Sequence, residues 1–268
     1  MYAKFVSLVA FLWLMPGMAA AQGSDQSLAE QLANPISSLI SVPFQYNFDC
    51  CFGPRDGEKH TLNIQPVIPK GISPNWNIIV RTILPVVGFT SPAPGIDDEF
   101  GLSDTVQSFF FSPKATHHGV TWGAGPVFLW PTATDRDLGS DKWGAGPTFV
   151  ILKQQSGWTY GVLTNHIWSY ADSSGGSRKP EVNATFLQPF LSYTWEDSTT
   201  LALNTESTYD WTAEEWNIPI NLIVSHVYNF GQQPVQLAVG GRVYADSPED
   251  GPEWGLRGVV TFLFPTGG

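Results

Sequence analysis

Residues 199–228, TTLALNTESTYDWTAEEWNIPINLIVSHVY, contain two long alternating segments joined by the polar turn TAEE. In the first segment, apolar side chains such as Leu201 and Leu203 alternate with polar ones such as Asn204 and Glu206. Successive side chains of a β-strand point to opposite faces, so this pattern predicts one apolar and one polar face. The second segment repeats it, with Trp216, Ile218, Ile220, Leu222 and Val224 opposite Asn217, Pro219, Asn221, Ile223 and Ser225.

Both segments are long enough to cross a lipid bilayer. A tilted transmembrane strand needs about 9–11 residues, whereas strands of soluble proteins are usually about five or six residues long. Because an open sheet would leave backbone groups unpaired in lipid, strands that cross a membrane must close into a barrel. The hairpin therefore predicts an all-β fold, a closed antiparallel transmembrane up-and-down β-barrel.

The N-terminus has the features of a secretory signal peptide. Lys4 precedes an apolar run from Phe5 to Met15, and small residues at Ala19 to Ala21 offer a cleavage site. The run has about 11 residues, fewer than the roughly 20 of a membrane-spanning helix. We expect a helical turn from Leu28 that Pro35 stops, on the periplasmic side or within the barrel mouth. The expected parts are a signal peptide at 1–21, a periplasmic N-terminal segment at 22–37 and an outer-membrane barrel at 38–268.

The composition limits the partners. Only 14% of the 268 residues are charged and the net charge is −11, which argues against nucleic acid as a partner. After the first 21 residues, no uninterrupted apolar run is long enough for a membrane helix. A chain of this length fits one all-β domain, and an acidic surface suits loops that face outside the cell.

Ten further segments alternate like the hairpin, which gives twelve strands. The three consecutive residues Phe109 to Phe111 leave the register of one of them open. The total becomes fourteen if the long connection between the third and fourth strands holds a hairpin. The ten segments are residues 40–49, 60–69, 76–84, 103–113, 119–131, 143–154, 158–170, 182–195, 235–245 and 254–264.

The connections between these strands alternate in length. Those after odd-numbered strands, such as DCCFGPRDGEK and GFTSPAPGIDDEFGL, are mostly long and rich in Asp, Gly and Pro. Those after even-numbered strands, such as QSG and EDS, are short. Bacterial outer-membrane barrels have long outer loops and short periplasmic turns, so both termini are predicted to be periplasmic.

Inward-facing polar side chains are the candidate functional residues. Charged residues inside a barrel can form a ring that selects solutes, or they can pair with one another and fill the lumen. Both interpretations stay open, and Asp104 is a further candidate for either. The predicted lumen-lining residues are Arg81, Glu206, Asp210, Arg242, Arg257, Asn204, Asn221 and Gln45.

Two adjacent pairs of reactive residues have simpler explanations. Cys50 and Cys51 can close only a strained ring, because the Cα separation preferred in a disulfide exceeds that of consecutive residues. We expect a structural or incidental role for them. His117 and His118 lie in a predicted short turn without a pocket, so we expect a solvated turn.

No metal, cofactor or catalytic site is predicted. Asp135, Asp137 and Asp141 lie in one loop, but their spacing lacks the Gly and the terminal Glu of a calcium-binding hand. No Ser stands in a nucleophile-elbow pattern. The sequence therefore favours a protein that is not an enzyme.

Several passages, among them LNIQPVIP, WGAGPVFLWPTATD, NTESTYDW and PEWGLRGVVTFLFP, resemble a widespread family of bacterial outer-membrane proteins. Its members are called simply "transporter", are often mislabelled neuromedin U, and are similar to the outer-membrane barrels of the MetA pathway of phenol degradation. The resemblance covers the whole chain after the signal peptide. It implies a barrel that passes small compounds, including hydrophobic or aromatic ones, and it supplies no catalytic or binding residue. Cys50-Cys51 departs from the flexible polar loop expected there.

The leading hypothesis is an outer-membrane channel or transporter for small solutes, whose partners are membrane lipid and the solute. A closed structural or adhesive barrel with a filled lumen is the first alternative. An outer-membrane enzyme is the second, and it needs a nucleophile and a base at one rim of the barrel. The sequence indicates no oligomeric state.

Overall fold

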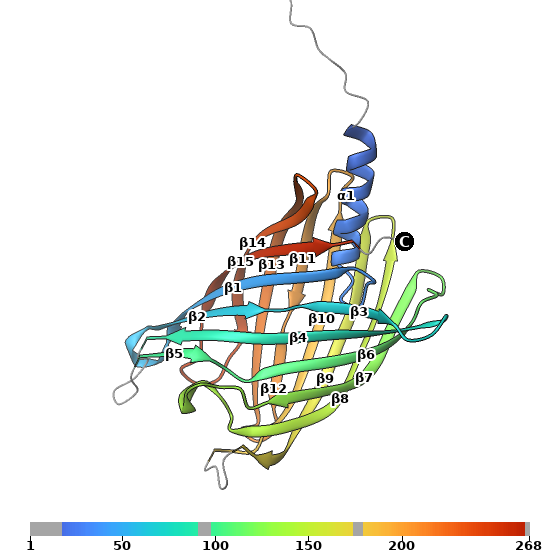
Figure 1. The fold of residues 1–268 in the computed structure, drawn as a ribbon. Coiled ribbons are helices and arrows are strands. Elements are labelled where there is room, and N and C mark those ends of the chain that lie inside the picture. Colours follow the sequence, from blue (N-terminus) through green and yellow to red (C-terminus); the bar gives the residue numbers. More distant parts are fainter. Residues whose placement is uncertain (1–17, 91–97, 174–178, 266–268) are drawn as a thin grey trace, which may run out of the picture.

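The computed structural model describes residues 18–90, 98–173 and 179–265, with side chains from Asp25 onward. Within these ranges the chain forms a closed antiparallel barrel with twelve strand positions around its wall (Figure 1). Strand β1 (Ile40–Phe52) pairs with β15 (Trp254–Phe264), from Ile40 opposite Phe264 to Cys50 opposite Trp254, and this pairing closes the barrel. The predicted fold is confirmed.

At three of these positions the strand is interrupted once and carries two labels. Fifteen labelled strands therefore fill the twelve positions of the described chain. Three short helices accompany them: α1 (Met18–Leu32), η1 (Gly53–Arg55) and η2 (Arg136–Leu138). Between β1 and β15 lie β2 (Gly57–Ile64) with β3 (Val67–Gly71), β4 (Trp76–Phe89), β5 (Glu99–Leu102) with β6 (Thr105–Pro113), β7 (Val120–Trp130), β8 (Lys142–Gln155), β9 (Trp158–Asp172), β10 (Asn183–Thr194), β11 (Thr199–Thr205) with β12 (Ser207–Asp210), β13 (Glu215–Phe230) and β14 (Gln233–Asp246).

The count of twelve, not fourteen, follows from how β5 is placed. Strand β5 pairs with the end of β4, with Leu102 opposite Val86, and leads into β6, which continues along the same neighbour. It is therefore an extension of the strand at the fourth position, β6. Part of the long connection, residues 91–97, lies outside the described ranges. The register left open by the sequence is also set, because Phe110 is fully buried inside and Phe111 is exposed outside.

Prolines explain the break between β11 and β12. The pairings on either side place Pro189 of β10 beside Thr205 and Pro219 of β13 beside Glu206. Proline has no N–H group, so it cannot donate to the ladder from either neighbouring strand. The register continues unchanged across the break, and the predicted hairpin forms with Leu203 opposite Leu222.

The outer surface of the barrel is apolar. In the hairpin of residues 199–228, the mid-strand residues Leu203 and Leu222 are 45% and 55% exposed. Aromatic side chains form a belt near each end of the barrel, the arrangement that anchors a transmembrane barrel at the two lipid–water interfaces. One belt contains Trp76, Trp122, Trp158, Trp195 and Tyr228, and the other contains Trp168, Tyr170, Trp211, Trp216 and Trp254.

Long and short connections lie at opposite ends of the barrel, as predicted. The short-turn end has connections such as 156–157 between β8 and β9, and the long-loop end has connections such as 131–141 between β7 and β8. Helix α1 and the end of β15 both lie at the short-turn end (Figure 1). No helix in the described chain is long and apolar enough to span a membrane.

The N-terminal helix is longer than expected. Instead of a turn that starts at Leu28, α1 runs for 15 residues and ends at Leu32, shortly before Pro35. The side chain of Asn34 then accepts a hydrogen bond from the Ile36 amide and turns the chain toward β1. The predicted signal peptide falls mostly on residues 1–17, outside the described ranges, and stays a prediction.

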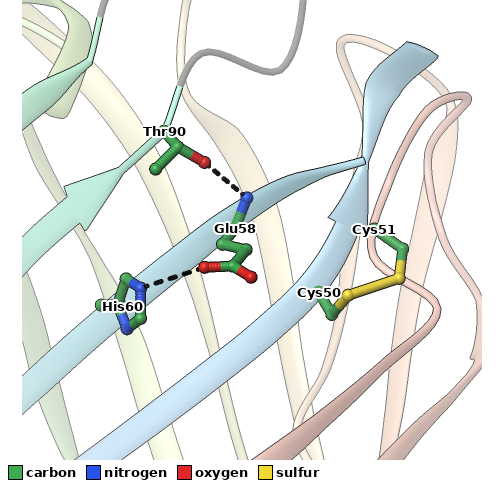
Figure 2. The surroundings of a disulfide bond; sticks show 5 residues. All are labelled: Cys50, Cys51, Glu58, His60 and Thr90. Atoms are coloured by element: carbon green, nitrogen blue, oxygen red, sulfur yellow. Dashed lines mark hydrogen bonds and ion pairs between the residues drawn. A yellow bond between two sulfur atoms is a disulfide. The ribbon is translucent and has the colours of Figure 1, made fainter. Parts of the chain in front are cut away.

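Cys50 and Cys51 form a disulfide at the end of β1. The register of β1 with β2 shifts between Cys50 and Phe52, so Cys51 is the extra residue of a β-bulge and has a positive φ of 74°. Figure 2 shows the pair at the strand end, with Glu58 and His60 on the neighbouring β2. The pair therefore lies where β1 leaves the barrel wall, at the long-loop end.

Candidate functional site

One side of the lumen wall, which we call the apolar half, carries a cluster of large apolar side chains. Strands β4, β6, β8 and β9 point large apolar side chains inward, and these pack into one cluster with Ile36 from the segment after α1. The inward face of these strands also carries small buried polar residues, such as Ser112, Thr148 and Thr159, but its large side chains are apolar. The cluster contains Ile36, Ile79, Phe110, Val150, Leu152 and Leu163.

The opposite half of the wall is polar. Strands β1, β11 and β13 to β15, with the junction between β11 and β12, bring buried charged and amide side chains together. We call this group the central network. It consists of Asn47, Asp49, Asn204, Glu206, Asn221, Arg242, Tyr244 and Arg257.

Glu206 joins the two buried arginines of the central network. Its Oε1 accepts from Arg257 Nη1 at 2.9 Å, and its Oε2 accepts from Arg257 Nη2 at 2.6 Å and from Arg242 Nη2 at 3.0 Å. The contact with Arg257 is a bidentate guanidinium–carboxylate pair, which fixes orientation as well as charge. Arg257 Nε also donates to Asn47 Oδ1 at 2.7 Å, so this guanidinium is held from both sides.

Asp49 is the second carboxylate of the network. Its Oδ1 accepts from Arg242 Nη1 at 3.1 Å and from the Tyr244 hydroxyl at 2.8 Å. Gly255 pairs with both Asp49 and Arg242 in the sheet. A Cβ at Gly255 would lie 2.6 Å from Asp49 Oδ1, so glycine leaves the space through which the two side chains meet.

Two asparagines extend the network along the wall. Asn221 is fully buried; its Oδ1 accepts from Arg242 Nε at 2.8 Å and its amide nitrogen donates to Asn204 Oδ1 at 2.9 Å. The three residues are cross-strand neighbours on β11, β13 and β14. Their polar groups are therefore satisfied by one another, as burial requires.

Arg81 and Lys59 lie near the network with fewer partners. Arg81 Nη2 donates to Gln65 Oε1 at 3.2 Å, and its charge interacts with that of Glu206 without direct contact. Lys59 interacts electrostatically with Asp49 and Arg242. Lys59 comes from β2 and Arg81 from the neighbouring β4, which also carries Ile79 of the apolar cluster.

The N-terminal segment 25–39 enters the lumen at the short-turn end. Ala29 and Leu39 pack against Val227 and Leu263 of the wall, and all four are buried. Polar contacts fasten the segment as well: Gln154 Nε2 donates to the Glu30 carbonyl at 2.8 Å and Asn229 Nδ2 to Asp25 at 2.6 Å. The segment thus forms a floor across the lumen.

A cavity of about 270 Å³ lies between this floor and the central network. We call it the lumen cavity. Arg81 and Asn204 line it on the network side, while Asn34 and Ser37 line it on the floor. Further lining residues include Gln45, Gln65, Val67, Gln188, Phe190, Ser192, Ile223, Gln236 and Thr261.

Seven of the eight predicted lumen residues face this region. Glu206, Arg242, Arg257, Asn204 and Asn221 meet in the central network, and Arg81 and Gln45 line the lumen cavity. Asp210 does not belong with them. It is exposed at the end of β12, where its Oδ1 accepts from the Thr212 amide at 2.7 Å and the Ala213 amide at 3.2 Å, so it stabilises the outer turn.

The sequence reasoning missed five polar residues of this region. The alternation of the sequence could have indicated them, because each lies at a position where the side chain points inward. Asn47 and Asp49, for example, lie on the polar face of the first strand. Which inward residues meet depends on the closure of β1 onto β15, which brings residues about 200 positions apart together. The five are Asn47, Asp49, Lys59, Gln65 and Tyr244.

Asp104 and Glu181 fasten the long-loop end instead of lining the cavity. Asp104 Oδ2 accepts from the amide and the hydroxyl of Ser140, both at 2.6 Å, and so binds the loop after β7. A hydrogen bond from Ser169 and the charge of Lys142 hold the pKa of Glu181 below its usual value. Lys142 also contacts Asp172 at 2.6 Å, which ties β8 to the end of β9.

The other candidates are dispersed. Three of the five described histidines form ring hydrogen bonds, His60 with Tyr46, His166 with Thr185 and His226 with Thr199, and none of these partners is a serine. Carboxylate oxygens of Glu99, Asp135 and Asp137 lie within 4.8 Å of one another at the long-loop end, without Asp141. Acidic side chains on a surface often gather in this way, so we assign them no metal.

No family model and no curated protein matches this sequence. Solved structures do resemble it: the COG4313 outer membrane channel from Pseudomonas putida F1 has a TM-score of 0.64 at 15% identity, over 85% of this chain and 96% of that one. Outer membrane phospholipase A from Escherichia coli has a TM-score of 0.47 at 9% identity (88% and 98% covered), and the KdgM porin 0.45 at 12% (84% and 99%). The first likeness confirms the fold. The apolar outer face and the aromatic belts are those of a barrel that spans a membrane.

Proposed function

We propose that the protein is an outer-membrane channel through which small solutes pass, with its short-turn end in the periplasm. The observation that carries this proposal is the lumen cavity, which is bounded by the polar wall, the apolar wall and the N-terminal segment. A lumen filled by its own side chains would leave no space of this size. The fold shared with the Pseudomonas channel supports the same function.

The N-terminal segment is suited to open and close this path. It is no strand of the barrel; side-chain hydrogen bonds and apolar contacts hold it to the wall. It can therefore leave the lumen without breaking a backbone ladder. The sheet itself is closed by its backbone ladders, so the segment is the part whose position decides whether solutes pass.

The wall also supports a class of solute. One side of it carries the apolar cluster and the other carries the central network, which suits compounds with a hydrophobic body and a polar group. The resemblance of sequence passages to the transporter family, and to the barrels of the MetA pathway of phenol degradation, supports small hydrophobic or aromatic compounds. We propose no catalytic role; hydrolysis of phospholipid vesicles by the refolded protein would contradict this.

Recordings across planar lipid bilayers test the channel function. Residues 22–268, refolded and inserted, are expected to give step-like currents above protein-free controls. A variant without residues 22–37 is expected to conduct several times more, because its floor is absent. If neither protein gives currents above the control, the proposed function is wrong.

A closed structural or adhesive barrel is the second candidate. The pairing of Glu206 with Arg242 and Arg257 favours it, because these side chains occupy part of the lumen with one another. The two candidates differ in the deletion variant. A closed barrel stays without current when residues 22–37 are removed, whereas a channel conducts.

A further inference from the structure

Arg81 differs from the other two arginines that face the lumen. Arg242 and Arg257 each have a carboxylate within ion-pair distance. In the part of the chain that the structure describes, Arg81 has a hydrogen bond to Gln65 and no ion pair. A guanidinium offers five N–H donors, so most of those of Arg81 are available.

The nearby carboxylates are already occupied. Both oxygens of Glu206 accept from arginines, and Asp49 accepts from Arg242 and Tyr244. Among the described mid-lumen residues, four cations (Lys59, Arg81, Arg242 and Arg257) stand against two carboxylates (Asp49 and Glu206). This region therefore has an excess of two positive charges. An inward-facing cation without a counter-ion favours an anion from solution.

The space in front of Arg81 has the size and chemistry of a small-ligand site. The lumen cavity of about 270 Å³ is close to the lower end of pocket volumes that bind small molecules, about 300 Å³. The amides of Gln45, Gln65 and Gln188 also line it, and they can donate to further oxygens of an anion. Such a volume admits one compact molecule.

The opposite side of the cavity is apolar. Phe190 of β10 lines it there and packs against the buried cluster around Phe110, while Val67, the cross-strand neighbour of Arg81, adds an apolar contact on the arginine side. A guanidinium on one side and an aromatic ring on the other match a ligand with a charged group and a compact apolar body. An inorganic ion such as chloride would leave the apolar side without a partner.

We propose that Arg81 and the lumen cavity bind a small monocarboxylate with an apolar body, of about the size of benzoate. This deepens the proposed channel function and rests on it. The guanidinium pairs with both carboxylate oxygens in the bidentate geometry that arginine favours, and the apolar body lies against Phe190. The site makes Arg81 the residue that selects anionic from neutral solutes.

Calorimetric titration with benzoate tests the site. The probe is added to residues 22–268 folded in a neutral detergent, and benzamide serves as the uncharged compound of the same shape. Benzoate is expected to bind at least about tenfold more tightly than benzamide, because only the carboxylate forms a charge-assisted hydrogen-bonded pair with the guanidinium. Acetate and chloride are expected to bind more weakly than benzoate, because they lack the apolar body.

Three variants locate the binding. Arg81→Gln is expected to lose the preference for benzoate over benzamide, and Arg81→Lys to keep part of it, since an ammonium retains the charge without the fork. Arg136→Gln removes the same charge from an exposed loop and is expected to bind like the unmodified chain. Folding of each variant is checked by its heat-dependent mobility on gels.

The proposal is overturned if benzoate and benzamide bind the unmodified chain equally, or if a folded Arg81→Gln binds benzoate as before. The first comparison needs no variant, so a variant that does not fold leaves the test intact. Bilayer currents without a preference for benzoate would overturn only this proposal. Absence of currents would overturn the channel function, whatever the calorimetry shows.

Discussion

The two halves of the lumen wall have the same backbone and opposite chemistry. On β13 and β14, inward residues such as Asn221 and Arg242 are buried in hydrogen bonds and ion pairs. On β8 and β9, inward residues such as Leu152 and Leu163 are buried against other apolar groups. The bilayer requires only that the outer face be apolar, so the inner face is free to differ from strand to strand. The difference gives the lumen a charged side and an apolar side.

The largest effect is expected from breaking the polar half at Glu206. Glu206→Leu leaves Arg242 and Arg257 without this carboxylate, and removing one partner of a buried pair costs about 3–5 kcal/mol. The free energy of unfolding, measured in urea by tryptophan fluorescence in phospholipid vesicles, is expected to fall by about 4 kcal/mol. Glu249→Leu in an exposed loop is the control. Equal, small losses in both variants would mean that the network does not stabilise the barrel.

A smaller effect is expected from the apolar half. Leu152→Ala removes buried methyl groups inside the lumen and should cost about 3 kcal/mol in the same unfolding experiment. Ile151→Ala, one residue earlier, faces lipid and is 38% exposed, so its cost should be clearly smaller. If the two variants lose the same stability, the inner apolar cluster is not packed as described.

Asn221 tests whether the polar half acts as one unit. Asn221→Leu leaves Arg242 Nε and Asn204 Oδ1 without their partner, which should cost about 2 kcal/mol of unfolding free energy. The double variant with Arg242→Met should cost less than the sum of the two single changes, because it removes an interaction shared by both. Strictly additive losses would show that the two residues are independent.

The smallest effect is expected at Cys50 and Cys51, outside both halves. A bond between consecutive residues closes almost no chain, so it removes little entropy from the unfolded state. Replacing both residues by serine should change the unfolding free energy by less than about 0.5 kcal/mol. A loss of several kcal/mol would assign the bulge at the end of β1 a role in barrel stability.

The sequence was sufficient to predict which side chains lie on the outside of the barrel and some of those that lie inside. Alternation predicts strands and faces where inner and outer residues differ, as with Leu203 and Asn204. Alternation does not reveal the apolar half of the lumen wall, because in segments such as residues 109–111 the side chains on both faces are apolar. It also could not show that Arg81 forms no ion pair with a described carboxylate while Arg242 and Arg257 share Glu206, since that depends on which strands become neighbours on closure. Asp210 was misplaced because alternation continues into the turn, where backbone hydrogen bonds decide the position of a side chain.

The most direct test of the account is the access of water to two neighbouring residues on β1. In a chain with both native cysteines replaced by serine, Gln45→Cys and Phe44→Cys are each treated in lipid vesicles with a membrane-impermeant methanethiosulfonate. Gln45 lines the lumen cavity and Phe44 lies on the outer face, so only the cysteine at position 45 is expected to react, and its reaction is expected to reduce solute flux. Reaction at position 44 with none at position 45 would contradict a water-filled lumen lined by inward side chains.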